Sequence, residues 1–464
     1  MQVIFVIENL MKSSSHGPHV VLINPPIYDF ALYDLFLKPF GLLRIGKWLE
    51  QNSYEVTHIN ALDYSDPVSL ETLGKPQRRR DGTGKFFRQE LDYPENLARI
   101  PRKFARYGIV KEELLRKIRS LDRKPDLILI TSGMTYWYRG VQEAVELCRI
   151  AWPGCPVGVG GVYATLMKEH CLKVCAADFV TKGPVWPGMK EELEKRGFPL
   201  PSGAPGVDYM NDDPVWRDSA VIRLNEGCPF NCDYCASSCL SPKFQAGDPG
   251  QAIKTIKALY ERWGTRDFAF YDDALLVDKE KIFIPFLKEI IRLNLPLRFY
   301  NPNALHIRYL DENVLKLMIR AGFREIRMGF ESSDDDFHEK KDGKVTMDVF
   351  ARAVDALKSS GFPLHKVAVY ILAGLPGQRW EEVERSIRYA SGFGLRCRLA
   401  QFSPVPGTAL WDESVRTSSF PLEEEPLYHN STFFSMEWEG FRREDLERLK
   451  KLTRELYFRP EKRP

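Results

Sequence analysis

Residues 226–235 read Glu226-Gly227-Cys228-Pro229-Phe230-Asn231-Cys232-Asp233-Tyr234-Cys235. The spacing C-x3-C-x2-C offers three thiolates from one tight loop, with no obvious fourth ligand beside them. Thiolates are the usual protein ligands of iron–sulfur clusters. Three ligands on a four-iron cube leave one iron open, and an open iron can bind a substrate as well as carry electrons. The loop is therefore predicted to hold a [4Fe-4S] cluster through Cys228, Cys232 and Cys235.

Two other interpretations of these cysteines stay open. One is a zinc knot with Cys239 as a fourth thiolate, and the other is disulfide pairing. Zinc sites favour paired C-x2-C units, so both are less favoured. Cys239 is expected to be a small buried residue, with a thiol on the substrate side as the alternative. Cys171 and Cys175, four apart on a predicted helix, are interpreted as buried structural residues.

The composition is typical of an ordinary soluble protein, and the length predicts two or three domains. The chain has 464 residues, of which 44% are hydrophobic and 28% charged. Nine cysteines in this length do not make a disulfide scaffold, so a reducing compartment is expected. No apolar run is long enough to span a bilayer, and the first residues lack the basic region of a secretion signal. The predicted location is the cytoplasm.

Positive charge is concentrated in one segment. Residues 75–124 hold 16 Lys/Arg and 7 Asp/Glu, including Arg78-Arg79-Arg80. Such a block could bind phosphate groups. The favoured interpretation is instead a solvated insertion, in which the charges keep a long loop soluble. Because stacked aromatic residues do not accompany the basic ones, a nucleic-acid partner is unlikely.

The N-terminal third alternates apolar strands with helices. Strands are predicted near residues 19–24, 55–60, 126–131 and 156–161, and helices near 39–51 and 141–151. This alternation predicts a doubly wound parallel sheet of the Rossmann type. Ligands of such sheets bind at the carboxyl ends of the strands.

A second alternation begins near residue 220. Strands are predicted at residues 220–225, 268–271, 297–301, 325–330, 367–373 and 396–402, and helices at 252–263, 282–293, 311–321, 347–359 and 380–392. Six such units predict a partial (β/α)6 barrel, whose active site lies at the C-terminal ends of the strands. An amphipathic helix is expected at 441–456 in the tail.

The cysteine loop, with Tyr234 before its last cysteine, resembles that of the radical S-adenosylmethionine (SAM) enzymes. The resemblance implies that the open iron chelates the amino and carboxylate groups of SAM. An electron from the cluster, delivered by a donor such as ferredoxin or flavodoxin, then cleaves SAM to methionine and a 5′-deoxyadenosyl radical. The cysteines would be the metal ligands and catalytic residues, and Tyr234 is included among the cofactor-binding candidates.

Residues after later strands extend the resemblance to the branch with cobalamin-dependent methyltransferases. Glu331 and Ser332 match a Glu-Ser pair near the SAM amino group and ribose, and a carboxylate is a suitable acceptor for an ammonium. Asp272 matches an acidic position that faces the cavity, with a helix N-cap as the alternative. The segment that passes the adenine is matched by Gly374, Leu375 and Pro376.

The N-terminal sheet resembles the cobalamin-binding domain that precedes many radical SAM domains. The matching residues follow two predicted strands: Thr131, Ser132, Gly160 and Gly161. Glycine there would let the backbone approach the corrin or its nucleotide tail closely. The D-x-H-x-x-G motif that supplies a histidine ligand to cobalt is absent. Either cobalamin binds without a histidine ligand, which is favoured, or the domain has lost cobalamin.

These patterns predict four segments: an extension at 1–18, a cobalamin-binding-like domain at 19–206 with an insertion at about 64–125, a radical SAM barrel at 207–415 and a helical tail at 416–464. The predicted reaction is cobalamin-dependent methylation of an unactivated carbon or a phosphinate. The alternatives are a cobalamin-independent rearrangement, cyclisation or oxidation, and an iron–sulfur electron-transfer protein. The substrate could be a small molecule, a lipid or a peptide.

Overall fold

The N-terminal domain is built on a five-stranded parallel sheet. The computed structural model describes residues 17–458 except 96, 184, 206–208 and 211, so most of the predicted extension lies outside the described residues. The strands are β1 (His19–Asn24), β3 (Glu55–Asn60), β6 (Leu127–Ser132), β7 (Val157–Gly161) and β8 (Phe179–Val180), in the order β3-β1-β6-β7-β8. From β1 the chain first adds β3 on one side of the sheet and then β6, β7 and β8 on the other side. Doubly wound sheets bind ligands at such a switch in strand order, here between β1 and β6.

Alternating residues of β1 explain how both faces of this sheet are covered. Val20 and Leu22 pack with α2 (Phe40–Glu50), together with Met189 and Leu193 of α8 (Val185–Lys195). Val21 and Ile23 point the other way, into a second core, because successive side chains of a strand face opposite sides. That second core contains residues of α4 (Lys111–Arg119), α5 (Tyr138–Ala151) and α7 (Lys168–Cys175).

The basic insertion has its own structure, so the prediction of a solvated loop was wrong. It contains α3 (Pro67–Leu73), and it supplies β4 (Arg88–Glu90) and β5 (Ala105–Tyr107) to a small antiparallel sheet with β2 (Ile27–Asp29). Arg106 in the middle of β5 is only 3% exposed, and its guanidinium lies 2.6 Å from the Glu143 carboxylate of α5. The segment therefore docks on the sheet domain through buried charge as well as apolar contacts.

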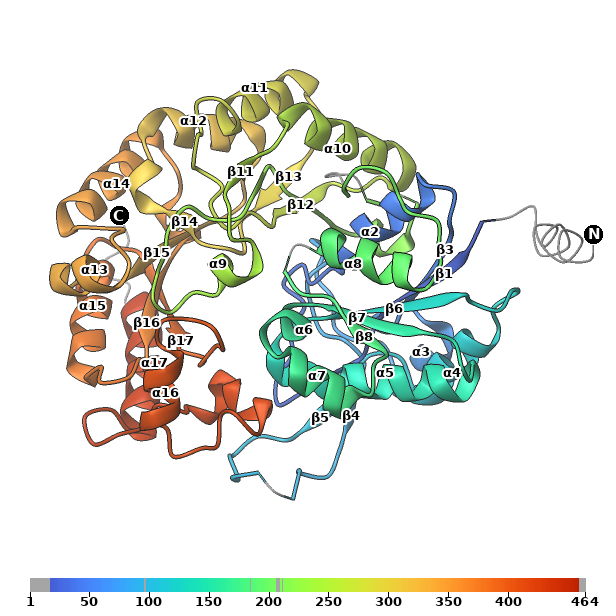
Figure 1. Ribbon diagram of the computed structural model, residues 1–464. Helices are drawn as coiled ribbons and strands as arrows, with labels where there is room; N and C mark the ends of the chain where they lie inside the picture. Colours follow the sequence, from blue (N-terminus) through green and yellow to red (C-terminus); the bar gives the residue numbers. More distant parts are fainter. Residues whose placement is uncertain (1–16, 96, 184, 206–208, 211, 459–464) are drawn as a thin grey trace, which may run out of the picture.

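The second domain curves around two parallel sheets. One has the order β13-β12-β9 and the other β14-β15-β16-β17. The strands are β9 (Ala220–Ile222), β12 (Asp267–Phe270), β13 (Arg298–Tyr300), β14 (Leu305–His306), β15 (Ile326–Glu331), β16 (Val367–Ala373) and β17 (Arg396–Gln401). In Figure 1 the helices between them form an outer arc: α10 (Pro249–Trp263), α11 (Phe283–Leu293), α12 (Glu312–Ala321), α14 (Met347–Ser360) and α15 (Trp380–Gly392).

The bounds of the outer helices follow from local capping. The side chains of Asp248, Asp311 and Thr346 accept hydrogen bonds from backbone N–H groups in the first turns of α10, α12 and α14. Such caps satisfy donors that have no partner within the helix. The same three helices end at glycines in the left-handed conformation, which costs glycine little. The caps therefore account for where α10, α12 and α14 begin and end, close to the predicted bounds.

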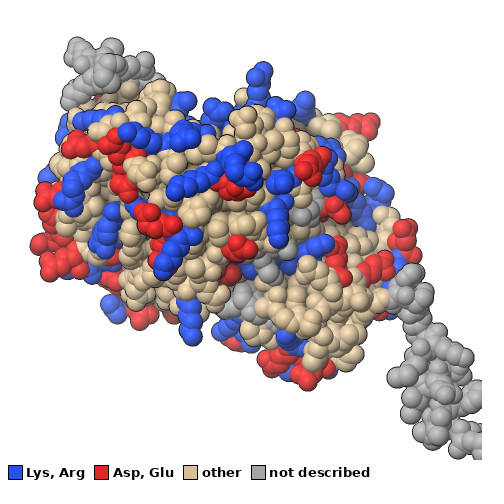
Figure 2. Space-filling view, turned by 90° about the horizontal axis from the view of Figure 1, so that it is seen from above, with Lys and Arg blue, Asp and Glu red and all other residues tan. Residues whose placement is uncertain are grey.

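The tail contains α16 (Trp411–Thr417) and α17 (Arg443–Phe458), and α17 packs on α15 and β17. The predicted tail helix is therefore present. Among the described residues, no helix combines the length and apolar character needed to cross a bilayer. Figure 2 shows basic and acidic side chains interspersed over one face of the molecule, so that face has no region of a single charge sign suited to a nucleic-acid backbone.

Candidate functional site

The three cysteines lie on one loop between β10 (Asn225–Glu226) and α9 (Ser237–Leu240). At the start of the loop Gly227 has φ +75°, and a Cβ there would lie 2.5 Å from the Lys243 carbonyl oxygen. Two backbone hydrogen bonds hold the middle of the loop: Asp233 N–H donates to the Lys341 carbonyl at 3.0 Å, and Leu410 N–H donates to the Asp233 carbonyl at 3.2 Å. Segments following β15 and β17 therefore fix the loop.

The three thiols of the loop are partly or fully shielded from solvent. Cys232 is 7% exposed, while Cys228 and Cys235 are half-buried. Burial raises the pKa of Cys232 to about 11, opposed by the nearby Lys344 ammonium. A buried thiol with so high a pKa becomes a stable thiolate only beside strong positive charge, such as metal ions supply.

The zinc and disulfide alternatives gain no support. All nine cysteines are free. Among the described residues no three His, Cys, Asp or Glu side chains are grouped to hold a single metal ion. Cys239 is half-buried, not buried as expected, and its thiol donates to the Gly407 carbonyl at 3.2 Å. Cys171 and Cys175 are buried on α7, in agreement with the prediction.

Asp272 joins the end of β12 to the segment that leads into the cysteine loop. Its buried carboxylate accepts the backbone N–H of Leu224 at 3.0 Å and of Asn225 at 2.6 Å. Burial raises the pKa of Asp272 to about 7, although these two donors oppose the rise. The side chain holds backbone rather than capping a helix, so it positions the cysteine loop.

Glu331 ends β15 in an unusual backbone conformation. Its φ is +66°, and the pairing of β15 with β16 shifts register between Gly329 and Glu331. Left-handed residues other than glycine cost of order 1 kcal/mol or more, and they cluster at functional sites. The Glu331 carboxylate lies over Gly329, where a Cβ would be 2.9 Å from its Oε1. Burial raises the pKa of Glu331 to about 7, opposed by Lys344, so a bound cation would favour its ionised form.

Three residues that the sequence analysis missed surround Tyr234. The Tyr234 hydroxyl donates to Asp342 at 2.9 Å and lies 3.3 Å from the Lys344 ammonium. His338 bonds to Asp342 at 2.9 Å and to the Ser332 carbonyl at 2.9 Å. These hydrogen bonds connect Tyr234 to Ser332 through Asp342 and His338 in one polar network. These residues stand in the charged stretch that ends and follows α13 (Asp335–Lys341), which reads in sequence as solvent-exposed, so only their position after β15 could have indicated them.

Burial alone would lower the pKa of Lys344, but Glu331, Cys232 and Asp342 hold it above its ordinary value. Lys344 is therefore a fixed positive charge between the cysteine loop and the Glu331 carboxylate.

The segment after β16 is held by its own side chain and by the tail. Gln378 Oε1 accepts the N–H groups of Gly374 at 2.8 Å and of Leu375 at 3.2 Å. Gly374 has φ +92°, and a Cβ there would meet the Phe434 ring at 2.7 Å. The missing side chain therefore makes room for an aromatic residue of the tail. Leu375 is buried, and Pro376 follows it in the same turn.

The four predicted cobalamin residues meet at the carboxyl ends of β6 and β7. Ser132 Oγ donates to the Gly160 carbonyl at 2.7 Å and accepts the Ala164 N–H at 3.1 Å. Gly161 has φ +102°, and a Cβ there would collide with the Ser132 carbonyl oxygen. Thr131 and Gly161 line both a cavity of about 290 Å³ at the sheet edge and a smaller one of about 60 Å³ beside it.

The larger cavity, here called the interdomain cavity, also has walls from the second domain. Arg223, after β9, and Tyr271, after β12, line it opposite Thr131 and Gly161. Arg223 lies 3.4 Å from the Glu226 carboxylate at the start of the cysteine loop. Moreover α6 (Val162–Leu166), which follows β7, contacts α9, which follows the cysteine loop. No histidine is among the described residues that line this cavity.

The sequence of residues 222–390 matches the radical SAM superfamily. The cysteine loop stands at the start of the matched part, and the strand ends that carry Asp272, Glu331 and Gly374 all lie within it.

Curated relatives match at low identity. The chain is 26% identical over 219 residues to an uncharacterised methyltransferase from Pyrococcus horikoshii, covering 46% of each chain. It is 25% identical to an uncharacterised methyltransferase from Synechocystis over 66% of this chain and 60% of that one. Identity is 22% with an anaerobic magnesium-protoporphyrin IX monomethyl ester cyclase from Cereibacter sphaeroides, over 65% and 55%. The chain spans about half the length of these relatives.

Solved structures share the two-domain fold. The methyltransferase TsrM from Kitasatospora setae, with cobalamin and a [4Fe-4S] cluster bound, superposes with a TM-score of 0.65 at 15% identity, over 87% of this chain and 76% of that one. The cobalamin-dependent SAM radical enzyme OxsB gives a TM-score of 0.52 at 10% identity, over 95% and 61%. The predicted α/β architecture is thereby confirmed.

Proposed function

We propose that this chain is a cobalamin-dependent radical SAM methyltransferase. The observation that carries the proposal is the adjacency of two sites. Gly133 and Gly161, after β6 and at the end of β7, line one cavity of about 290 Å³ together with Arg223, five residues before Cys228. A methyl carrier and a radical generator have to act on one substrate, and such an arrangement lets both face it. When bound, the cluster would supply the electron that cleaves SAM, and cobalamin would carry the methyl group.

The chain's own residues position and neutralise charge in this scheme. Cys228, Cys232 and Cys235 would hold the cluster. The Glu331 carboxylate, buried beside Lys344, is suited to accept a hydrogen bond from an ammonium such as that of SAM. Lys344 supplies positive charge to the thiolate-rich loop. The low exposure of Cys232 and Glu331 keeps water away from the reacting groups.

For cobalamin, the fit rests on the open sheet edge. Gly160 and Gly161 both line the small cavity of about 60 Å³, which lies between β6, β7 and α2. The absence of histidine from the described lining favours cobalamin bound without a histidine ligand. Thr131, Ser132, Gly160 and Gly161 would contact it.

The remaining parts of the proposal are coarser. The methyl acceptor would be an unactivated carbon or a phosphinate of a small molecule, lipid or peptide. The reductant would be a ferredoxin or flavodoxin, and nine free cysteines suit the reducing cytoplasm. The resemblance to the ester cyclase keeps one second candidate, a radical cyclisation or oxidation without methyl transfer.

The test is anaerobic reconstitution with iron, sulfide and hydroxocobalamin, followed by removal of unbound ligand. The expected result is about four irons and one cobalt per chain, and formation of 5′-deoxyadenosine from SAM under reduction. Cys232→Ala should lose iron and 5′-deoxyadenosine while keeping cobalt, and Cys239→Ala should keep all three.

The outcomes separate the candidates. Four irons without cobalt would exclude the cobalamin-dependent reaction and favour the second candidate. Iron without 5′-deoxyadenosine in the wild type would reduce the chain to an iron–sulfur binding protein.

A further inference from the structure

A second cavity, of about 370 Å³, lies on the inner side of the second domain's sheets, toward the N-terminal ends of β15 and β17. Arg396 and Arg398, two apart on β17, both line it. Cys397 between them faces the opposite way, with its thiol 3.5 Å from the Ile387 carbonyl of α15. Because strand residues alternate in direction, the two arginines share the face opposite Cys397, where the Arg396 guanidinium also lies 4.8 Å from the centre of the Tyr457 ring of α17. We call this cavity the arginine pocket.

The arginine pocket carries an excess of positive charge. Four arginines (79, 327, 396 and 398) line it with two carboxylates, Asp81 and Glu325. Arg327 is 4% exposed and bonds to Glu325 at 2.9 Å and to the Tyr370 hydroxyl at 3.0 Å. Barrel interiors are ordinarily filled with branched apolar side chains, so this interior is built for something polar.

Arg398 is the unsatisfied member of the group. Its Nε is buried without a hydrogen-bond partner among the described residues. Burial, reinforced by Arg396 and Arg327, lowers the pKa of Arg398. A buried N–H donor without a partner costs free energy, and an anion that accepts a hydrogen bond from Arg398 Nε would remove that cost.

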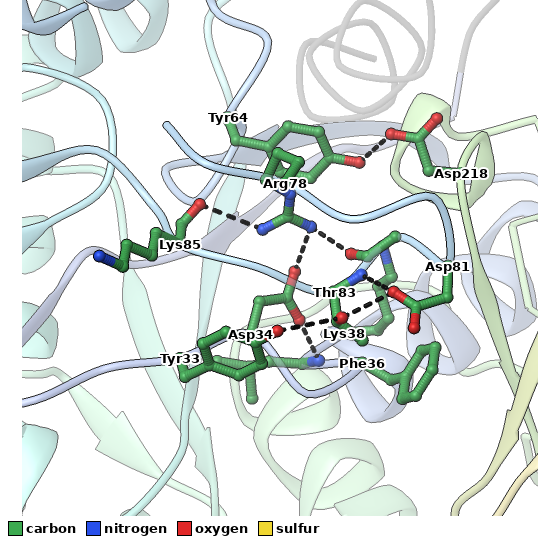
Figure 3. Close-up of polar contacts among 12 residues, drawn as sticks. Tyr33, Asp34, Phe36, Lys38, Tyr64, Arg78, Asp81, Thr83, Lys85 and Asp218 are labelled. Atoms are coloured by element: carbon green, nitrogen blue, oxygen red, sulfur yellow. Dashed lines mark hydrogen bonds and ion pairs between the residues drawn. The ribbon is translucent and has the colours of Figure 1, made fainter. Parts of the chain in front are cut away.

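The opposite wall comes from the basic insertion and is held firmly. As Figure 3 shows, Arg78 points inward to Asp34, with 2.7 Å between Nη2 and Oδ2, and Asp34 is 1% exposed. The Arg78 guanidinium also lies 3.7 Å from the centre of the Tyr64 ring, and Tyr64 bonds to Asp218. Arg78 therefore anchors the loop that carries Arg79 to the segment entering the second domain.

The rim of this wall is ordered by short polar contacts. Thr83 Oγ1 donates to Asp81 at 2.6 Å and lies 3.2 Å from the Tyr33 hydroxyl. Arg79 stands exposed at the mouth. The arginine pocket is thus lined by both domains, with the exposed Arg79 at its mouth, the half-buried Arg396 and Arg398 on its wall and the buried Arg327 among its lining residues.

We propose that the arginine pocket binds the carboxylate or phosphate group of a small organic acid. Guanidinium groups match the geometry of both oxyanions and bind them through paired N–H donors. Arg327 and Glu331 lie four residues apart on β15, about 13 Å at about 3.3 Å per residue. The pocket therefore lies at the opposite ends of the strands from the cysteine loop. The binding itself does not depend on the radical reaction.

The experiment measures anion binding to the full-length protein, anaerobically and in anion-poor buffer. Thermal unfolding is followed during titration with inorganic phosphate, glycerol 3-phosphate and succinate, with potassium chloride of equal ionic strength as reference. The expected result is stabilisation of the wild type by at least one of the oxyanions beyond the chloride effect. Arg398→Gln and Arg396→Gln should weaken that binding at least tenfold. Arg320→Gln, an exposed arginine at the end of α12, should bind as the wild type does.

Stability without ligand separates binding from a structural role. If Arg398 serves a ligand, Arg398→Gln removes repulsion between arginines, and the unliganded protein keeps or raises its Tm. A lower Tm without ligand, or unchanged affinity in both pocket variants, would overturn the proposal. Glycerol 3-phosphate binding at least as tightly as inorganic phosphate would support a group carried by an organic molecule. Tenfold weaker binding with the glycerol tail, and no binding of succinate, would instead indicate a site for free inorganic anions and refute the organic acid.

Discussion

The Lys344 ammonium lies 3.3 Å from the Tyr234 hydroxyl, so a cation from the segment after β15 contacts the cysteine loop. The same ammonium opposes the rise in the pKa of Cys232. A cluster held by thiolates carries negative charge, and a fixed cation beside it stabilises that charge in a partly buried site. Lys344 is therefore expected to stabilise the loaded loop without being a ligand.

Replacing Lys344 by methionine should weaken iron retention. The reconstituted variant is expected to retain iron against a chelator about fivefold to tenfold less well than the wild type, which corresponds to about 1 to 1.4 kcal/mol. Iron release is followed by the visible absorbance under argon. Lys340→Met, four residues earlier and paired with the exposed Asp336, is the matched control and should behave as wild type. Equal iron release from both variants would show that Lys344 does not stabilise the cluster.

The buried pair of Arg106 and Glu143 should dominate the docking of the insertion. Glu143 also accepts the Tyr28 hydroxyl at 2.5 Å, so one carboxylate joins β2, β5 and α5. Arg106→Met leaves this carboxylate buried without its cation, which costs about 3–5 kcal/mol. Urea unfolding measures the loss.

The pair of Lys316 and Glu312 on α12, both exposed, offers the control for that prediction. Lys316→Met removes a surface pair one turn apart, worth about 0.5 kcal/mol or less. A cost for Arg106→Met as small as this would mean that solvent reaches Glu143.

The main strands and helices were predictable because their apolar pattern is local. β8 and β14 were missed because two residues are too short to show a pattern. The small sheet of the insertion was missed because β4 and β5 carry charged residues such as Arg88 and Arg106. Arg106 is buried only because Glu143, 37 residues later, neutralises it. Sequence alone does not indicate such a distant partner.

Much of the site was predictable for a topological reason: parallel strands bring their C-terminal ends to one edge, so residues that follow different strands meet. The contacts that close the site were not predictable. Phe434 fills the space over Gly374 from 60 residues away, and Lys344 follows a charged helix that reads as solvent-exposed. Asp272 was expected at the cavity, and its carboxylate instead holds the backbone before the cysteine loop.

A larger side chain in the cavities at the ends of β6 and β7 should reduce cobalamin binding without affecting the iron–sulfur cluster. Gly41, in the first turn of α2, lines both cavities at the ends of β6 and β7, and a Cβ there meets nothing within 4 Å. Gly41→Leu should therefore fold, with stability unchanged or higher by about 0.5–1 kcal/mol, because glycine is a poor helix former. Its side chain would occupy the space proposed for cobalamin.

The expected readout is a cobalt content at least tenfold below that of wild type with the iron content unchanged. Gly392→Leu on α15, where a Cβ also meets nothing within 4 Å, is the control and should keep cobalt. Full cobalt in Gly41→Leu would place cobalamin elsewhere or show that the sheet edge does not bind it.

Asp272 should make stability depend on pH in the sense opposite to that of an ordinary surface carboxylate. Its pKa is about 7 in the folded protein, against an ordinary value of 3.8, because the group is buried. The folded state then holds a proton that the unfolded state has lost, and stability falls as pH rises between these values. The contribution is fully present below about pH 4 and lost as pH passes 7.

Asp272→Asn tests this directly. Asp272 Oδ1 accepts both the Leu224 and Asn225 N–H groups, and an asparagine oxygen can keep both bonds without titrating. Unfolding free energies of wild type and variant are compared at pH 5, 6, 7 and 8 in urea. The variant should gain on the wild type as pH rises, by about 1.4 kcal/mol for each pH unit over which Asp272 is protonated only in the folded state. A difference that stays constant over this range would mean that the carboxylate is already ionised at pH 5, with its charge stabilised by the two backbone donors.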